Sequence, residues 1–297
     1  MNDDALTFED HRPALLGLAY RMLGSMGEAE DVVQDAWIRW QGRRVAVDAP
    51  RAYLMRTVTN LCLNTLDSAR VRLQHHPGSR LPEPVHTDDG DGRAVERSEA
   101  VSMALLVALQ QLSAAERAVL VLHQVFEIPH AEIAAILGRS AAGCRQLLRR
   151  ARAHLRHDHT VQTPSRDEHA RLLQAFVQAT TTGTVDDLVA LLAEEAQLLA
   201  DAGPEGATYG PVRNLPGPLQ GARKVAAFLH AATGRAPTDT QIEVRELNGL
   251  PALVSSRNDE VIGVLLLDVH DGRIRRVFIQ ADRQRLRRLA SPRHLEA

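Results

Sequence analysis

The spacing of apolar residues changes once along this chain. Up to about residue 157, apolar side chains recur every three or four positions, the period of an amphipathic helix. From about residue 241 they alternate with polar ones, and Asn248-Gly249 and Asp271-Gly272 separate the alternating runs as hairpin turns do. A chain of 297 residues is also too long for one ordinary core. The sequence therefore predicts helical domains followed by a separate α+β domain.

Two polar segments divide the chain further. Residues 75–92 contain three prolines and three glycines, which is typical of a linker or an extended arm. The stretch from His157 to Arg166 is polar as well. The predicted organisation is a helical domain over 1–73, a linker over 74–94, a helical domain over 95–158 and an α+β domain over 165–297.

Start and stop signals bound the predicted helices. Gly24 ends one helix, and Ser25-Met-Gly-Glu28 is a capping-box pattern for the next. Pro50 fits the first turn of a third helix, and Ser113-Ala-Ala-Glu116 repeats the capping box in the second domain. In the third domain, Thr184-Val-Asp-Asp187 caps a helix expected to carry Leu188, Leu191 and Leu192. Strands are expected at 241–245, 261–267 and 274–279, paired as antiparallel hairpins.

The strongest local motif lies between Glu132 and Arg156. A short helix stopped by Gly138, a tight turn and a longer helix from Ala141 predict a helix-turn-helix. The longer helix places its arginines on one face, and residues 139–156 hold six Arg and no acid. A helical hairpin with a solvated basic face is the alternative interpretation, but such a face usually mixes charges of both signs.

The arginine-rich helix predicts two kinds of DNA contact. Ser140 is a natural N-cap, so Arg145 and Gln146 lie early enough in the helix to reach base edges in the major groove. Arg149, Arg150 and Arg152 are better placed for phosphates.

Composition excludes several other classes of protein. Apolar residues make up 44% and charged residues 24%, which excludes a mostly disordered chain. No apolar run approaches the ~20 residues that a membrane span needs, and the acidic first residues argue against a secretory leader. Cys62 and Cys144 lie far apart in apolar helical patterns, so we expect no disulfide framework and a cytoplasmic protein.

Several motifs in order resemble extracytoplasmic-function sigma factors. Residues 28–40 are similar to the helix by which that family binds core RNA polymerase, and residues 48–64 to its promoter-melting, minus-ten-reading helix. Residues 113–156 resemble its minus-thirty-five domain. The resemblance implies two all-α sigma domains, with core RNA polymerase and promoter DNA as partners and no cofactor. Its polymerase-facing positions are Asp31, Gln34, Asp35 and Ile38, and its promoter-facing positions on the first domain are Arg51, Arg56, Asn60, Asn64 and Arg70.

The C-terminal part resembles a SnoaL-like domain, an α+β cone of the nuclear-transport-factor-like superfamily. Sigma factors with this extension carry a WLPEP motif in the first linker, which reads Arg80-Leu-Pro-Glu-Pro84 here. Their two motifs in the extension correspond to Asp201–Glu205 and Gln280–Gln284, where the residues differ. We expect the strip formed by Leu81, Pro82, Glu83 and Pro84 to be extended, to dock on this domain and to regulate the other two in cis.

Two other functions were compared with this one. A conventional helix-turn-helix regulator would dimerise on a palindrome. A DNA-binding module fused to an enzyme would place acid–base chemistry in the C-terminal domain, where Asp201, His230 and His270 are the candidates. The sequence instead favours structural positions, with Asp201 at the end of a strand, His230 on a helix surface and His270 in a turn. It also favours solvated histidines over a metal site at His75, His76, His154, His157 and His159.

Overall fold

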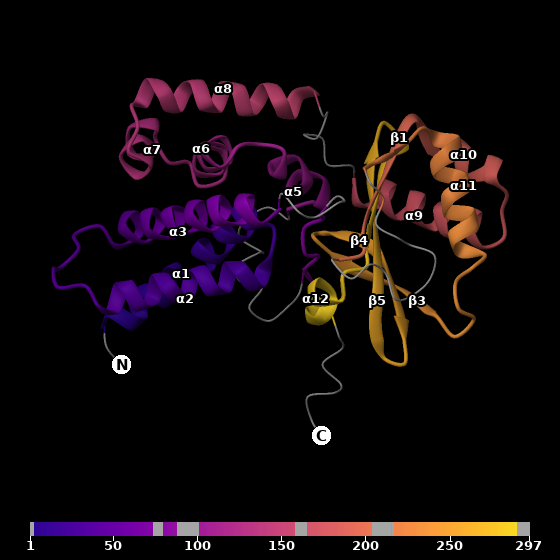
Figure 1. Cartoon of the computed structure of the whole chain (residues 1–297), viewed down its shortest axis with the longest axis horizontal. Helices are drawn as coiled ribbons and strands as arrows, with labels where there is room; N and C mark the ends of the chain where they lie inside the picture. Colours follow the sequence, from indigo (N-terminus) through magenta and orange to yellow (C-terminus); the bar gives the residue numbers. More distant parts are fainter. Residues whose placement is uncertain are drawn as a thin grey trace. The chain divides into compact units, whose positions relative to one another are not determined.

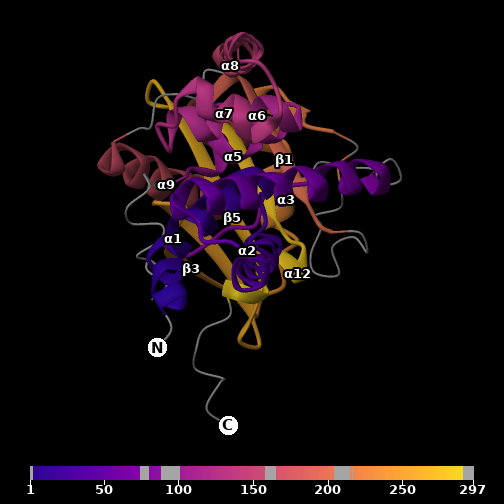
Figure 2. The ribbon, with the colours of Figure 1, turned by 90° about the vertical axis from the view of Figure 1, so that its left-hand side faces the viewer.

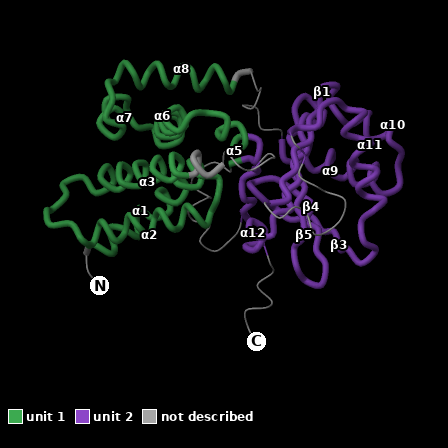
Figure 3. The backbone as a smooth tube through the Cα atoms, in the orientation of Figure 1, with its two compact units in different colours: residues 1–75, 88–101, 105–161 green, residues 76–87, 102–104, 162–297 purple. Residues whose placement is uncertain are grey.

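The computed structural model describes residues 3–73, 80–87, 101–157, 165–203, 215 and 217–289 (Figure 1). The chain forms two compact units (Figure 3). Unit 1 comprises residues 1–75, 88–101 and 105–161, and unit 2 comprises residues 76–87, 102–104 and 162–297. A short piece of the first linker therefore belongs to the unit that holds the C-terminal domain.

Helices build the described part of unit 1. They are α1 (Asp3–Leu23), α2 (Met26–Gln41), α3 (Pro50–Leu73), α5 (Met103–Gln110, in unit 1 from Leu105), α6 (Ala114–Gln124), α7 (His130–Leu137) and α8 (Ala141–His157). The first three pack against one another, and α6 and α7 lie between α8 and α3 (Figures 1 and 2).

The helix ends follow from the residues that bound them. Gly24 has a φ of 71°, the left-handed conformation that ends α1. The Oγ of Ser25 accepts the backbone N–H of Glu28 at the start of α2, over 3.4 Å. Ser113 and Glu116 form a complete capping box, and Gly138 ends α7 with a φ of 61°. These predicted boundaries are confirmed.

Trp40 anchors the core of the first three helices. Its side chain is buried, and its indole N–H donates to the backbone carbonyl of Asp4 over 2.9 Å. The guanidinium of Arg43 stacks 3.6 Å from the centre of the Trp40 ring and pairs with the Asp4 carboxylate. The beginning of α1 is thereby joined to the end of α2.

Unit 2 combines helices with one six-stranded sheet. Its elements are α9 (Arg166–Thr181), α10 (Val185–Leu191), β1 (Leu192–Asp201), β2 (Leu219–Gln220), α11 (Ala222–Thr233), β3 (Gln241–Leu247), β4 (Leu250–Arg257), β5 (Glu260–His270), β6 (Arg273–Gln280), α12 (Arg283–Leu286) and a 3₁₀ turn (Arg287–Leu289). The strand order is β2-β1-β6-β5-β4-β3. This architecture confirms the α+β fold expected of a SnoaL-like domain.

The sheet contains three strands beyond those predicted at 241–245, 261–267 and 274–279, namely β1, β2 and β4. The turns at Asn248-Gly249 and Asp271-Gly272 have positive φ at both residues, as predicted. However, α10 ends at Leu191, and Leu192 begins β1, which pairs in parallel with β6. The expectation that Leu192 belongs to the helix was therefore wrong.

Long-range contacts account for this difference. Arg273 on β6 donates to the carbonyls of Ala190 and Leu192, which satisfies backbone groups where the helix stops. Alternate residues of β1 then fill the core beneath the helices, while Asp201 lies on the opposite face of the sheet. On β6, Val277 belongs to the same core and Gln280 to the same opposite face.

Candidate nucleic-acid interface

Helix α8 separates an apolar face from a basic one. Its apolar stripe, with Cys144 and Leu147 among its members, is buried, and α8 packs against α6 and α7. Ser140 caps the helix, since its Oγ accepts the N–H of Gly143 over 3.1 Å. The other face is exposed and carries Arg145, Gln146, Arg149, Arg150 and Arg152. A helix held this way can present its first turns to a DNA groove.

Arg150 differs from its neighbours. Its Nε lies 3.4 Å from a carboxylate oxygen of Glu116, in the capping box of α6. Burial raises the pKa of Glu116, but hydrogen bonds from Ser113 and the charge of Arg150 outweigh it, and the net shift is downward. Arg150 is thus engaged with a carboxylate of its own domain, a contact that the sequence did not predict.

Helix α3 carries the residues expected to face the minus-ten element. Arg51, Arg56 and Asn64 are exposed and Asn60 is half-buried. Leu54 and Val58, which alternate with them, are buried in the core. Arg70 lies near the end of α3, and its side chain is outside the described part of the structure.

Helix α2 presents a mixed acidic and apolar surface. Asp31, Gln34 and Asp35 are exposed, while Val32 and Val33 between them are buried. Ile38 continues the same surface and is 59% exposed. This surface, defined by Asp31, Gln34, Asp35 and Ile38, is called the α2 patch below.

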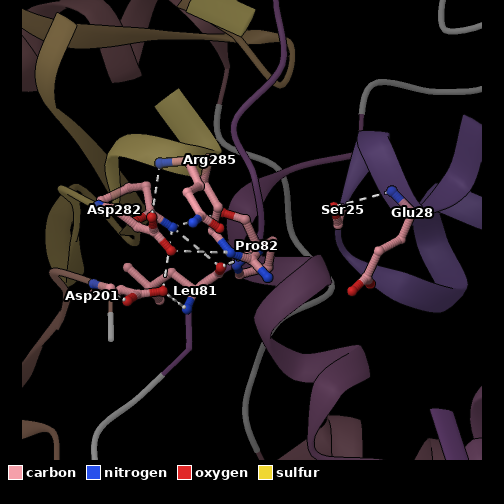
Figure 4. A network of polar contacts seen from close by, with 10 residues as sticks. Ser25, Glu28, Leu81, Pro82, Asp201, Asp282 and Arg285 are labelled. Atoms are coloured by element: carbon pink, nitrogen blue, oxygen red, sulfur yellow. Dashed lines mark hydrogen bonds and ion pairs between the residues drawn. The ribbon is translucent and has the colours of Figure 1, made fainter. Parts of the chain in front are cut away.

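The strip from Leu81 to Pro84 is buried in unit 2. The backbone N–H of Leu81 donates to Asp201 over 2.8 Å, and its carbonyl accepts from Arg285 over 2.7 Å (Figure 4). The side-chain amide of Gln280 donates to the carbonyls of Leu81 and Pro82 over 3.2 and 3.3 Å. Leu81 itself is 1% exposed.

The same segment continues along the end of β3. Glu83 is buried and lies 3.3 Å from Arg288, and Pro84 is buried beside it. Val85 and Asn248 exchange two hydrogen bonds, and His86 forms an antiparallel bridge with Leu247. The strip is therefore held by backbone groups at both ends.

Three residues that hold this strip were not among the predicted interdomain residues. They are Gln280, which begins a segment that the family resemblance pointed to, Arg285, and Asn248, which was predicted only as a hairpin turn. Gly203 lies next to this network: its N–H donates to Asp201 over 2.9 Å, and at its φ of 73° a Cβ would lie 2.9 Å from the Asp282 carboxyl carbon.

The candidate acid–base residues do not form one site. Asp201 is bound to the strip and to the N–H of Gly203. His230 is exposed on α11, and His270 lies 3.2 Å from Asp271 at a hairpin turn. Within the described ranges, no three His, Cys, Asp or Glu residues lie together in a way that could hold a metal ion. His75, His76 and His159 lie outside those ranges.

Comparisons with known proteins define the class of this chain. The Sigma-70 region 2 family matches residues 7–72, and the Sigma-70 region 4 family matches residues 102–155. The first therefore covers α1 to α3, and the second covers the helix-turn-helix and the helices before it. The helical part is that of an RNA polymerase sigma factor.

The relatives narrow this class further. The chain is 35% identical over 226 residues to the ECF RNA polymerase sigma factor SigJ of Mycobacterium tuberculosis, covering 75% of this chain and 70% of that protein. It is 30% identical over 277 residues to the probable ECF RNA polymerase sigma factor SigI of the same species, covering 91% of this chain and 90% of that protein. The crystal structure of SigJ superposes with a TM-score of 0.72 at 28% identity over 96% of this chain and 98% of that one. This chain belongs to the ECF RNA polymerase sigma factors.

In the part of the chain that the structure describes, no helix is long and apolar enough to cross a bilayer.

Proposed function

We propose that this sigma factor binds core RNA polymerase through the α2 patch and promoter DNA through α3 and α8, and so initiates transcription at promoters with minus-ten and minus-thirty-five elements. The observation that carries the proposal is that three surfaces are exposed on the two matched sigma regions. Region 2 carries the α2 patch and the polar stripe of α3, and region 4 carries the arginine face of α8. Ile38 is exposed beside Asp31, Gln34 and Asp35, and this combination of one apolar and several polar side chains suits a protein interface.

The arginine face of α8 supports recognition of duplex DNA. Arg145 lies in the first turns of the helix and is the candidate for a bidentate contact with guanine. Arg149 and Arg152 follow on the same face as phosphate contacts, which makes binding dependent on salt. Arg150 contributes less, since Glu116 already neutralises part of its charge.

The stripe on α3 supports reading of a melted element. Arg56, Asn60 and Asn64 combine one cation with two amides, and amide groups can bond to the exposed edges of unstacked bases. The sigma factor has no catalytic step of its own in this proposal, and it acts in the cytoplasm, where polymerase and promoter meet.

The C-terminal domain is proposed to act in cis on the sigma regions. The strip lies in the linker between regions 2 and 4, and Asp201, Gln280 and Arg285 hold it. Docking of the strip fixes the middle of that linker to unit 2, which shortens the free chain between the two DNA-binding regions. The extension can thereby set which spacing of promoter elements is bound.

Run-off transcription with purified core polymerase tests the proposal. The full chain should produce a promoter-dependent transcript, and an Asp31→Arg/Asp35→Arg variant should produce none. Residues 1–160 alone should transcribe with a different promoter-spacing preference. A full chain that binds promoter DNA as a dimer and never associates with core polymerase would contradict the proposal.

A further inference from the structure

Two histidine rings are in contact within region 4. His123 lies in the last turn of α6, and His130 is the first residue of α7. Their ring centres lie 4.2 Å apart, with the ring planes tilted by 57°. The chain turns back between them at Glu127, which adopts a φ of 55°, in the left-handed region. Both histidines are half-buried, and neither has a part in the DNA contacts proposed above.

A backbone carbonyl fixes the hydrogen position on the first of these rings. Nδ1 of His123 lies 3.1 Å from the carbonyl oxygen of Ile128. Because a carbonyl oxygen can only accept, Nδ1 of His123 carries the hydrogen. His130 differs, since neither of its ring nitrogens has a hydrogen-bond partner among the described residues. The ring of His130 is therefore held by packing against His123, while its nitrogens stay available to a ligand.

The charges that act on His130 are all positive. Helix α8 packs against α7 and places Arg145 and Arg152, two helical turns apart on its exposed face, close enough to influence the ring. Helix α6 contributes His123. Among the described residues, these charges include no carboxylate and no group of α3, which also packs against α7. Glu132 lies two positions after His130 on the same helix and so points to another side.

This environment keeps the His130 ring neutral in the free protein. Burial lowers the pKa of His130, and the charges of His123, Arg145 and Arg152 lower it further. A ring whose ordinary pKa is about 6.5 is then mostly uncharged at pH 7. An anion placed against the two arginines would reverse this balance, because its negative charge favours the protonated ring. In the proposed function, the phosphates of duplex DNA supply that charge.

We propose that His130 is a phosphate-binding residue of region 4 and that it takes up a proton from solvent when duplex DNA binds. The inference rests on the proposed function, in which Arg145 and Arg152 face the DNA. In the complex, the imidazolium donates an N–H to a phosphate oxygen, and this charge-assisted hydrogen bond is stronger than one from the neutral ring. On dissociation, the proton returns to solvent. The contact reads no base, so it adds affinity without changing sequence preference.

The direction of the pH dependence follows from this linkage. DNA raises the pKa of His130, so binding strengthens as the pH falls from the pKa of the complex to the lower pKa of the free protein. Above this window neither state holds the proton, and below it both do. A rise of one pKa unit corresponds to about a tenfold gain in affinity across the window. The additional cation should also steepen the salt dependence of binding by about one unit.

Promoter binding at pH 7.5 and pH 6.0 tests the coupling. The full chain would be assembled with core polymerase and titrated with the promoter duplex that supports run-off transcription. Between the two pH values, the affinity of the wild type should rise about three- to tenfold more than that of His130→Gln, whose side chain is polar but cannot be charged. His130→Lys carries a permanent charge, so it should bind more tightly than the wild type at pH 7.5 and show the pH dependence of His130→Gln. His230→Gln, at an exposed position of unit 2, should keep the wild-type pH dependence.

Calorimetry in buffers of different ionisation enthalpy counts the proton directly. Near pH 6.5 the wild type should take up about half a proton more per duplex than His130→Gln. Equal proton uptake in the two proteins would overturn the proposal. So would an affinity loss in His130→Gln that is the same at both pH values, because it would indicate a purely structural role. A wild-type holoenzyme that binds no promoter at either pH would instead refute the proposed function.

Discussion

The backbone N–H of Leu81 donates to the carboxylate of Asp201 over 2.8 Å, joining the linker between the sigma regions to the end of a strand 120 positions later. The carboxylate also accepts the N–H of Gly203, so two backbone donors hold it. Gln280 and Arg285 bind the carbonyl of Leu81 from the other side. Docking is therefore specified by backbone groups of the strip as well as by the buried leucine.

Leu81→Asp should release the strip from unit 2. Leu81 is 1% exposed and its backbone N–H binds Asp201, so the new carboxylate would be buried near another carboxylate. An unpaired charge in such a place costs several kcal/mol. We expect faster proteolysis between residues 74 and 94 and a run-off profile like that of residues 1–160. Ile242→Asp makes the same change at a position that is 55% exposed and should behave as wild type. Wild-type protease resistance in Leu81→Asp would refute the functional role of docking.

Reversing the charge of the α2 patch should abolish polymerase binding. Asp31 and Asp35 are exposed one helical turn apart, so Asp31→Arg/Asp35→Arg should change the free energy of unfolding by less than ~0.5 kcal/mol per site. Core binding would be measured by co-elution and folding by circular dichroism. Glu194→Arg/Glu195→Arg reverses two exposed charges on β1 and serves as the control. Native folding with unchanged core affinity would contradict the assignment of the α2 patch.

Much of the fold was predictable because its signals are local. Capping boxes, glycine stops and Asn-Gly or Asp-Gly turns act within a few residues, and each appears where the sequence places it. The end of β1 at Asp201 was predicted, but its start at Leu192 was not, because Leu192–Asp201 is rich in Ala and Glu and has little intrinsic β-propensity. Pairing with β6 and burial of alternate residues make it a strand, and neither is visible from the segment alone.

The features of the candidate site also divide into those set by local sequence and those set by tertiary contacts. The exposure of Arg145 and Arg149 follows from the helical period of α8, so sequence could anticipate it. The pairing of Arg150 with Glu116 and the burial of Arg117 depend on how α6 meets its neighbours. The sequence alone does not distinguish an exposed arginine from one that is buried or paired, because that difference arises from tertiary contacts.

The arginines of α8 should divide into two classes in promoter binding. Arg145→Ala should lower the affinity for the promoter. It should also reduce the preference for one base pair of the upstream element by roughly 1–3 kcal/mol, as expected for a guanine contact. Arg152→Ala should weaken all sequences alike and reduce the salt slope by about one unit. Arg150→Ala should have the smaller effect because of Glu116. Binding of each variant to a panel of single-base promoter substitutions at several salt concentrations measures this, and identical profiles for the first two would refute the division.

His169 should make unit 2 sensitive to mild acid. It is 1% exposed on α9, where one ring nitrogen, Nε2, lies 3.1 Å from the carbonyl of Leu267 and Nδ1 has no hydrogen-bond partner among the described residues. Burial lowers its pKa, although the Leu267 carbonyl and the Asp268 charge oppose the shift. The folded state therefore prefers the neutral ring, while the unfolded chain protonates near pH 6.5.

The sign of the effect follows from that difference. Above pH 6.5 both states are neutral at this site and stability is complete; as the pH falls below 6.5 the unfolded state gains a proton first, and stability declines by up to ~1.4 kcal/mol per pH unit until the folded pKa is reached. Hydrogen exchange of unit 2 in the full chain at pH 7.5 to 5.5 measures the decline. His169→Gln should remove most of it, and His230→Gln, at an exposed position, should leave it intact. Equal pH dependence in the two variants would show that another group is responsible.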